Sequence, residues 1–407
     1  MKDWINASIG DVCKVIAGQS PEGKYYNTDG TGLPFYQGKK DFGDKFIDVP
    51  QVWTLKTTKE AQDGDVLMSV RAPVGSINFA TDRVCIGRGL AAIRAGDKVD
   101  RNFLFYGLLH KKSEIKGSEG AVFASINKEQ IKKIEFPFPP LPEQKRIVAI
   151  LDEAFEGIDR AIANTKKNLT NARELFENYL NAAFTQKDDG WVEKKLGDIA
   201  TFRNGLNFTK NSKGESIKIV GVKDFQNNFW IHEEQLDSVT LDGDLKEIDI
   251  LRKGDILTVR SNGNKELIGR CVLIGDLSGK TSHSGFTIRI RIEREDIHLP
   301  FIVHFLKSME LRKQLVECGG GINISSLNQQ GLSLITMRFP SFAEQKAIVA
   351  IINEIATETQ RLESIYRQKL AALNELKQTI LQKAFTGELT ADPANQATKT
   401  AEGAIAA

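Results

Sequence analysis

The segment PLPEQKRIVAIL at residues 140–151 returns as SFAEQKAIVAII at residues 341–352. The two copies are 201 residues apart, and the same separation relates the AFT triplet at 183–185 to the AFT triplet at 384–386. The repeat therefore continues without an insertion or a deletion. Because surface loops tolerate changes in length, a repeat of constant length indicates a long regular element.

Both copies begin with signals for the start of a helix. Ser341 with Glu344 three residues later forms a capping box, and Pro142 suits a first helical turn, where its missing N–H would have no partner. Apolar residues then recur at spacings of three and four, as on one face of a helix. These signals predict helices at 141–185 and 341–388, and the 42 residues from Glu143 to Phe184 alone would span about 60 Å at 1.5 Å per residue. The apolar positions are Ile147, Leu151, Ala154, Ile158, Ala161, Leu169, Ala172, Phe176, Tyr179 and Ala183 in the first copy, and Ile348, Ile352, Ile355, Leu362, Tyr366, Leu370, Leu373, Ile380 and Ala384 in the second.

Neither helix can bury its apolar stripe alone. We therefore predict that the two helices pack on each other as an antiparallel coiled coil, which carries one globular segment to each end. An extra step of four, from Thr165 to Leu169, makes a local eleven-residue repeat that relaxes the supercoil without breaking the stripe. The alternative is that each helix covers only its own globular segment, but the repeat is longer than one domain face requires.

The globular segments at residues 1–140 and 186–340 are themselves related, and residues 186–190 form a polar linker at the start of the second. The shift between matching landmarks grows from 187 to 201, so the interior of the second segment has gained 14 residues net. The landmarks are Trp4 and Trp191, IGDV at 9–12 and LGDI at 196–199, GDVL at 64–67 and GDIL at 254–257, and SIN at 125–127 and SLN at 326–328.

The interiors of both segments have the pattern of β-strands. Runs such as VLMSV at 66–70 and TIRIRI at 287–292 are separated by Gly, Asn and Asp turns. One helical stretch follows in each, around 103–116 and around 300–317, and Gly-containing loops at 117–120 and 319–321 come next. The predicted fold class is α+β, with two related β-rich domains joined by the two long helices as a pseudo-two-fold internal repeat. Gly387 suits the end of the second helix, and the tail at 389–407 is expected to be disordered.

Composition sets limits on the class of protein. A chain of 407 residues with 41% hydrophobic residues has material for two cores. It has no apolar run approaching 18 residues and no apolar signal region after Met1, so we expect it to stay in the cytoplasm. Its cysteines have no metal-ligand spacing, which favours reduced core cysteines over a metal site. They are Cys13, Cys85, Cys271 and Cys318.

The distribution of charge favours local contacts with a polyanion over a general basic field. Residues 1–140 carry a formal charge of +3 and residues 191–340 carry +2, while the rest of the chain carries −3. The globular segments are thus mildly basic and the helices mildly acidic. Binding to nucleic acid would have to use small patches on the globular segments.

The stretches that come nearest to a catalytic, cofactor-binding or metal-binding motif are all incomplete. SGKT at 278–281 resembles a phosphate loop, but the required Gly five residues before Gly279 is Ile274. FPPL at 138–141 lacks the Asn of the Asn-Pro-Pro-aromatic motif that holds a flipped base in amino-methyltransferases. The histidines at 110, 232, 283, 298 and 304 have no ligand spacing. We therefore expect a binding protein that is not catalytic on its own and holds no metal.

Polar and basic residues at turns beside the predicted strands are the candidates for DNA contact. Arg pairs with guanine and Asn or Gln with adenine, whereas Lys mostly contacts phosphate. The alternative for any single residue is a solvated turn. Arg71 and Arg260 are expected in matching places after the repeated Gly-Asp strand. The candidates are Gln37, Lys39, Lys40, Arg71 and Arg88 in the first segment, and Arg203, Asn204, Lys223, Arg260, Asn262 and His283 in the second.

The chain resembles the specificity subunits of type I restriction–modification enzymes. The resemblance rests on FPFPPLPEQK at 136–145, FPSFAEQK at 339–346 and AFTGEL at 384–389, in this order after two divergent segments. It implies that 1–140 and 186–340 are target-recognition domains, each reading one half of a bipartite DNA sequence. It also implies that the helices set the distance between the halves.

The resemblance further implies partners and cofactors that composition does not show. Two modification subunits would dock on the helices and methylate adenine with S-adenosylmethionine, and restriction subunits would bring ATP and magnesium. This chain would hold no cofactor itself. The residues implied at the subunit interface are Glu143, Gln144, Lys145, Glu344, Gln345 and Lys346.

Two other classes of function stay open on sequence alone. A duplicated coiled-coil scaffold that binds only proteins would show no salt-dependent affinity for DNA, whereas a reader that contacts phosphates must. A self-sufficient nuclease or methyltransferase would need its own metal or cofactor site.

Overall fold

A computed structural model describes the chain at residues 4–115, 125–185, 190–209, 211–226, 228–309, 311, 314 and 326–391. The chain divides into two compact units, Met1–Lys166 with Gln368–Ala407, and Lys167–Arg367. Each unit thus holds one globular domain and half of each long helix. The predicted loops at 117–120 and 319–321, most of the linker and nearly all of the predicted disordered tail lie outside the described residues.

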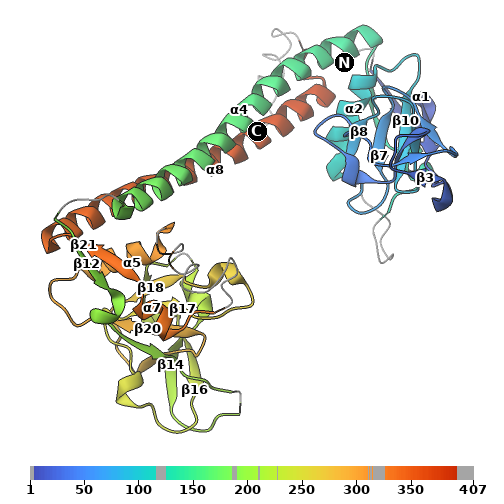
Figure 1. Cartoon of the computed structure of the whole chain (residues 1–407). Helices are drawn as coiled ribbons and strands as arrows, with labels where there is room; N and C mark the ends of the chain where they lie inside the picture. The colour runs from blue at the N-terminus through green and yellow to red at the C-terminus, as the bar shows by residue number, and fades with distance from the viewer. Residues whose placement is uncertain are drawn as a thin grey trace, which may run out of the picture. The chain divides into compact units, whose positions relative to one another are not determined.

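The two long helices have the same length. Helix α4 spans Leu141–Thr185 and α8 spans Phe342–Thr386, 45 residues each (Figure 1). The capping box before α8 is confirmed, because the Ser341 N–H donates to Glu344 Oε2 at 2.9 Å and the Glu344 N–H donates to Ser341 Oγ at 3.3 Å. Gly387 follows α8 with a φ of +76°, a left-handed conformation that suits a helix end.

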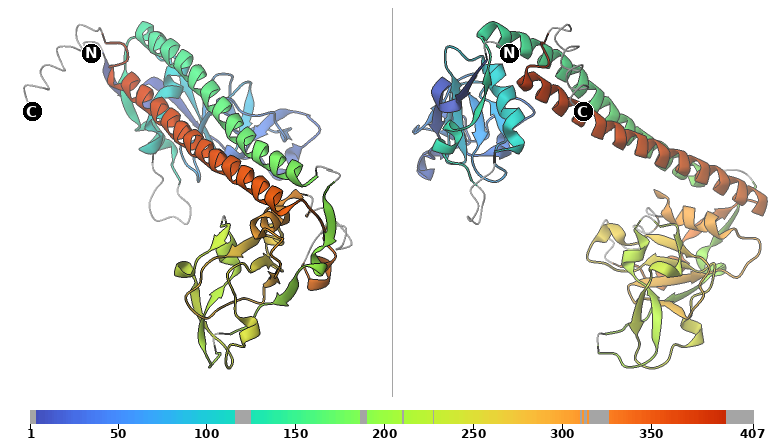
Figure 2. Two further views of the ribbon diagram at one scale, coloured as in Figure 1. Left: turned by 90° about the vertical axis from the view of Figure 1, so that its left-hand side faces the viewer. Right: turned by 180° about the vertical axis from the view of Figure 1, so that it is seen from behind.

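In each unit the two helices run antiparallel (Figures 1 and 2). In the first unit Lys377 of α8 binds Asp159 of α4, with Nζ 2.7 Å from Oδ1. In the second unit Arg173 of α4 binds Glu363 of α8, with Nε 3.0 Å from Oε1. Early residues of one helix therefore meet late residues of the other, which confirms the antiparallel prediction.

Each half-helix also covers a globular domain, so the apolar stripe has two uses. In the first unit Ile147 and Leu151 of α4 share one core with Phe385 of α8 and with Phe103 of the globular domain. The rings of Phe103 and Phe385 have centroids 5.0 Å apart. The end of α8 thus covers the first domain, from which it is far removed in sequence.

The described part of the first globular domain contains three sheets. Their strand orders are β1-β11, β2-β10-β7-β8 and β3-β5-β4-β9-β6. The strands are β1 (Ile5–Ser8), β2 (Cys13–Ala17), β3 (Tyr26–Asn27), β4 (Leu33–Tyr36), β5 (Trp53–Thr54), β6 (Glu60–Ala61), β7 (Val66–Ser69), β8 (Ile77–Phe79), β9 (Val84–Ile86), β10 (Leu90–Ala95) and β11 (Glu135–Phe138). The helices are α1 (Ile9–Val12), α2 (Arg101–His110) and α3 (Lys128–Lys132).

The second globular domain has the same framework. Its strand orders are β12-β21, β13-β20-β17-β18-β15 and β16-β14-β19. The strands are β12 (Val192–Lys195), β13 (Thr201–Asn204), β14 (Ser216–Val220), β15 (Trp230–Ile231), β16 (Asp237–Thr240), β17 (Ile256–Val259), β18 (Cys271–Ile274), β19 (Thr281–His283), β20 (Thr287–Arg291) and β21 (Thr336–Phe339), and the helices are α5 (Leu299–Lys307) and α7 (Gln329–Ser333). The order β13-β20-β17-β18 matches β2-β10-β7-β8, and the parallel pair β14 and β19 matches the parallel pair β4 and β9.

A central sheet with both faces buried organises each domain. In β7, Val66 and Met68 face the core that includes α2, and Leu67 faces the core under β4 and β9. In β17, Ile256 and Leu257 divide between two cores in the same way. Successive side chains of a strand point to opposite faces, so a strand buried on both sides is apolar at most of its positions, here all but Ser69 and Thr258. This accounts for the continuous apolar runs that begin at the repeated Gly-Asp dipeptide.

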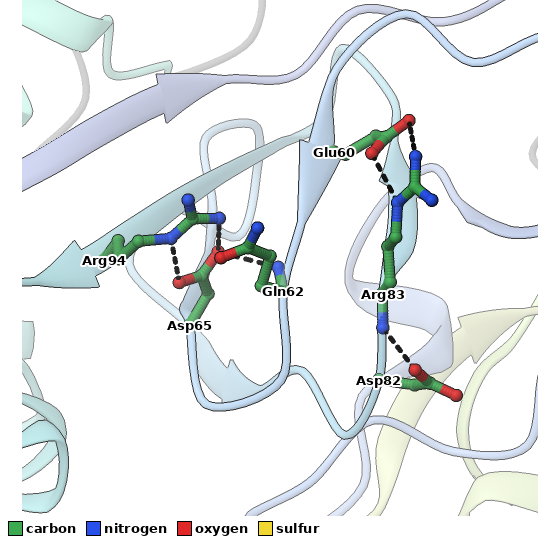
Figure 3. Close-up of polar contacts among 6 residues, drawn as sticks. All are labelled: Glu60, Gln62, Asp65, Asp82, Arg83 and Arg94. Atoms are coloured by element: carbon green, nitrogen blue, oxygen red, sulfur yellow. Dashed lines mark hydrogen bonds and ion pairs between the residues drawn. The ribbon is translucent and has the colours of Figure 1, made fainter.

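The repeated Gly-Asp dipeptide fixes the turn into the central strand. In the first domain both carboxylate oxygens of Asp65 accept hydrogen bonds from Arg94 of β10 at 2.8 Å, and Oδ2 also accepts from the Gln62 N–H (Figure 3). Asp255 accepts from Arg291 at 2.6 and 2.7 Å in the same manner. The second-domain turn is further closed by the Arg252 N–H, which donates to Asp255 at 2.7 Å. The sequence pattern pointed to the dipeptide but not to its arginine partner.

Sites for a metal or a membrane are not found in the described part of the chain. No group of three or more His, Cys, Asp or Glu side chains there could hold a metal ion, and no helix there is long and apolar enough to span a bilayer. Cys85 and Cys271 are buried free thiols and Cys13 is half-buried, as predicted for core cysteines, and burial raises the pKa of Cys271 to about 11. Cys318 lies outside the described residues.

Candidate nucleic-acid interface

Three segments of the first domain meet beside the central sheet: the end of β4, the turn between β9 and β10, and the loop after β7. The Gly87 N–H donates to the Tyr36 carbonyl at 2.8 Å, and the Val70 N–H donates to the Gly89 carbonyl at 2.9 Å. These bonds bring together segments that are far apart in sequence. Five predicted DNA-contact residues lie on them with exposed side chains: Gln37, Lys39, Lys40, Arg71 and Arg88.

The second domain joins the corresponding three segments by the same backbone bonds. The Ser284 N–H donates to the Val220 carbonyl at 3.0 Å, and the Arg260 N–H donates to the Phe286 carbonyl at 2.7 Å. The end of β14, the turn between β19 and β20, and the loop after β17 therefore form the equivalent surface. Both domains present one three-segment surface each.

A lysine occupies the same place on both surfaces. The 3₁₀ turn η2 (Lys39–Asp41) follows β4, and the 3₁₀ turn η5 (Val222–Phe225) follows β14. Lys40 and Lys223 are each the second residue of the turn, two residues after the glycine that caps it, Gly38 or Gly221. Both lysines were predicted as DNA contacts, and the structure shows that they are equivalent.

The surface of the second domain is concave. A hollow of 480 Å³ opens there, and its lining includes Phe208, Val222, Lys223, Asn262, Ser284 and Phe286. Lys223 pairs with Asp237, whose hydrogen bond raises the pKa of the lysine. Both side chains are more than half exposed, and exposed ion pairs contribute little to stability. The lysine can therefore exchange Asp237 for an incoming phosphate.

The expectation that Arg71 and Arg260 occupy matching places is wrong by one residue. The Ile126 N–H donates to the Val70 carbonyl at 3.1 Å, and the equivalent Leu327 N–H donates to the Arg260 carbonyl at 2.8 Å. Arg260 therefore matches Val70, and Arg71 matches Ser261. Adjacent side chains of an extended backbone point to opposite sides. Arg71 is exposed and Arg260 is half-buried.

Arg203 also differs from the expectation. It lies within β13 and forms an ion pair with Asp249, whose side chain is 7% exposed. Hydrogen bonding to that carboxylate raises the pKa of the Arg203 guanidinium. A buried carboxylate without its cation would be costly, so this pairing argues against a DNA contact by Arg203. The neighbouring Asn204 is exposed at the end of the strand.

The prediction that His283 contacts DNA is wrong, because the side chain is only 1% exposed. The Leu206 N–H donates to the His283 carbonyl just as the Gln19 N–H donates to the Ile86 carbonyl, so His283 occupies the core place of Ile86. Its Nδ1 lies 2.9 Å from Thr287 Oγ1. Burial lowers the pKa of His283 to about 3, so the ring is neutral at pH 7.

The subunit-interface role of Gln144 and Gln345 is contradicted as well, because each is 1% exposed. Gln144 Oε1 accepts from the Asp100 N–H at 2.8 Å, and its Nε2 donates to two carbonyls at 2.8 and 3.0 Å. Gln345 likewise accepts from the His298 N–H at 2.8 Å and donates to two carbonyls. Each Gln fastens the start of its long helix to the loop before α2 or α5, so the repeated residue is structural.

The other four predicted interface residues keep accessible positions. Lys145 and Lys346 are exposed, and Lys346 Nζ lies 4.4 Å from the centre of the Phe342 ring. Glu344 is the capping residue already described. Glu143 is half-buried, lies 3.7 Å from Arg146 and accepts a hydrogen bond from Thr390.

The turn residue Phe286 was not among the candidates from sequence. Its side chain is 60% exposed at the rim of the hollow. A single Phe before an alternating strand gives no pattern that separates it from core residues. The hydrogen bonds that its carbonyl accepts from the Arg260 and Ser261 N–H groups, at 2.7 and 3.3 Å, show that it belongs to the three-segment surface.

A family model described as "Type I restriction modification DNA specificity domain" matches residues 1–171 and 188–371. The chain belongs to this family. Each match takes in one globular domain and most of the long helix after it. The internal repeat is thus a repeat of the specificity domain, and the three-segment surface is present once in each copy.

Two curated relatives are specificity subunits. The chain is 40% identical over 183 residues to the putative type I restriction enzyme MjaX specificity subunit of Methanocaldococcus jannaschii, a match that covers 44% of this chain and 43% of the relative. It is 28% identical over 296 residues to the type I restriction enzyme StySPI specificity subunit of Salmonella potsdam, covering 67% of this chain and 62% of the relative. Both matches span less than two thirds of the relative's length.

Two solved structures share the fold of this specificity-domain chain. One, from a study of complex assembly and conformational transition of a type I R-M system, has a TM-score of 0.75 at 18% identity and covers 96% of this chain and 99% of its own. The other, the HsdS subunit of Thermoanaerobacter tengcongensis, has a TM-score of 0.58 at 18% identity and covers 96% and 98%. At such identity the likeness concerns the fold alone.

Proposed function

We propose that this chain is the DNA specificity subunit of a type I restriction–modification complex. Each globular domain reads one half of a bipartite target. The observation that carries the proposal is the three-segment surface, which recurs in both specificity domains with exposed residues that differ between them. Two domains of one fold with different surface residues suit two half-sites of different sequence.

The long helices have two roles in this proposal. They set the spacing between the half-sites and provide docking sites for two modification subunits. Accessible residues at the two helix starts, Lys145 and Lys346, support docking there. A scaffold that binds only proteins would have no use for a recurring surface that presents an exposed lysine in the same place in both domains.

Catalysis belongs to the partner subunits. S-adenosylmethionine would be held by the modification subunits, which methylate adenine, and ATP and magnesium by restriction subunits. This chain would contribute recognition and geometry, and the complex would act in the cytoplasm. The missing Asn-Pro-Pro-aromatic motif and the incomplete phosphate loop in the sequence support this division.

The test is reconstitution. The purified chain alone should not methylate DNA, and addition of modification subunits with S-adenosylmethionine should give methylation at one bipartite sequence. DNA binding by the complex should weaken as salt is raised, because phosphate contacts release counterions. Methyl transfer by the chain alone, or methylation without a defined sequence, would contradict the proposal.

A further inference from the structure

Two equivalent turns present different side chains to solvent. The Leu90 N–H donates to the Gly87 carbonyl at 3.0 Å, and the Thr287 N–H donates to the Ser284 carbonyl at 2.9 Å, so each closes a four-residue turn before β10 or β20. The two central residues are Arg88 and Gly89 in the first turn and Gly285 and Phe286 in the second. Each turn therefore pairs one glycine with one large exposed side chain.

Both turns are held at a fixed place by backbone bonds. The carbonyl of the third turn residue accepts from Val70 in the first domain and from Arg260 in the second. In the second domain the buried His283 and the Ser284 carbonyl both bond the Thr287 hydroxyl, at 2.9 and 2.8 Å. A side chain on a braced turn is ordered before binding, which favours specific recognition.

The hollow beside Phe286 is lined by a residue with a polar atom that has no partner. The residue Ser284 lines the hollow but is only 6% exposed, and its Oγ is buried and makes no hydrogen bond. A buried hydroxyl without a partner is unfavourable and is satisfied when a ligand atom bonds it. Exposed single aromatic residues are common on proteins, but Phe286 lines the same hollow as Ser284, Lys223 and Asn262.

Comparison of the two surfaces separates what the domains share from what differs. Lys40 and Lys223 are equivalent and alike, so they suit the feature that all half-sites share, the phosphate backbone. Arg88 and Phe286 lie on equivalent turns but differ in chemistry, so they suit the feature that distinguishes the half-sites, the base edges.

We propose that Arg88 and Phe286 are specificity-determining residues of the two domains. Arg88 donates to a guanine in the half-site read by the first domain, and Phe286 contacts the 5-methyl group of a thymine in the half-site read by the second. Arg forks onto guanine O6 and N7, and an aromatic ring packs on the thymine methyl. This proposal rests on the proposed function and names the chemistry by which it discriminates.

The first test measures the DNA-binding affinity of the wild-type complex and of the complex with Phe286→Ala. Each is measured on the mapped target and on a set of DNAs in which one thymine of the second half-site at a time is replaced by deoxyuridine. This replacement removes only the methyl group. At one thymine the wild type should bind the uracil DNA about fourfold more weakly, the value of one buried methyl group. Phe286→Ala should be insensitive to that replacement. Trp230→Ala is the matched control, because Trp230 is an exposed aromatic residue of the same domain outside the lining of the hollow.

The second test maps methylation by Arg88→Ala on a library with randomised half-sites. Selectivity for guanine should fall at one position of the first half-site and stay unchanged in the second. Wild-type binding that is indifferent to every thymine methyl overturns the role of Phe286, and so does a half-site without thymine. Unchanged selectivity of Arg88→Ala overturns the role of Arg88. If the wild type itself has no defined target, the proposed function has failed, which is a different result.

Discussion

At the scale of single residues, backbone hydrogen bonds distinguish residues that look alike in sequence. Arg71 and Arg260 follow the strands β7 and β17, and Arg203 lies within β13. Arg71 is exposed, Arg203 is paired with the buried Asp249, and Arg260 is half-buried. Sequence spacing could not separate them, because an error of one residue in the repeat reverses the side to which a strand residue points.

Arg71 remains the predicted base contact on the loop after β7. Arg71→Ala should weaken binding by about 1–3 kcal/mol if the guanidinium bonds a base, and only for targets that keep the first half-site intact. Binding measured on targets mutated in one half-site at a time decides this. Equal weakening on all sequences would instead identify a phosphate contact. Lys24→Ala, which removes an exposed lysine paired with Glu22, is the control.

Buried histidines should make the second domain sensitive to acid. Burial lowers the pKa of His283 to about 3 and that of His304 to about 4, against about 6.5 in an unfolded chain. Below pH 6.5 the unfolded state binds more protons, so the free energy of unfolding falls as the pH falls, by about 2 kcal/mol per histidine at pH 5. The first domain has Ile86 where the second has His283, so this contribution to acid sensitivity should be absent from the first domain.

Hydrogen exchange at pH 5 and pH 7, corrected for intrinsic rates, measures this difference domain by domain. Exchange in β19 and β20 should accelerate at pH 5 more than in β9 and β10. His283→Ile, which copies the first domain, should remove about half of the effect. Equal responses of the two domains would show that these histidines are not the cause.

At the scale of elements, the glutamines at the two helix starts join helix to domain. Gln144→Ala removes three hydrogen bonds and leaves the Asp100 N–H and two carbonyls without partners. The free energy of unfolding of the first unit should fall by about 1–3 kcal/mol. Urea unfolding with Lys145→Ala as control tests this, because Lys145 is exposed and its loss should change stability by less than about 0.5 kcal/mol. Equal effects of the two substitutions would contradict the structural role.

The elements that could be predicted from the sequence are those in which a clear residue pattern extends over many positions or follows a recognisable turn. Helices α4 and α8 were predictable because 45 residues repeat one apolar pattern, and β7 and β17 because a Gly-Asp turn precedes an apolar run. Strands of two residues, such as β3 and β5, have no period to detect. The role of Gln144 was missed because its partners are backbone atoms 5 to 46 residues away, which no side-chain pattern reveals.

At the scale of the whole molecule, the proposed role of the helices as a ruler can be tested by changing their length. Four residues inserted after Lys166 in α4, and four after Arg367 in α8, add about 6 Å to each helix at 1.5 Å per residue. The insertions fall where the two units divide the chain. Four residues are close to one turn, so the apolar stripe keeps its face, and matched insertions keep the antiparallel ion pairs within each unit.

Base pairs are about 3.4 Å apart along the duplex, so the spacer between half-sites should lengthen by about one or two base pairs while both half-site sequences stay the same. A methylation map of the assembled variant provides the measurement. Insertion of four residues in the polar stretch after α4 is the control, because it leaves both helices unchanged and should leave the spacer unchanged. An unaltered spacer in the helix variant, with methylation retained, would mean that the helices serve as docking surfaces alone, since a ruler whose length has changed cannot select the same distance.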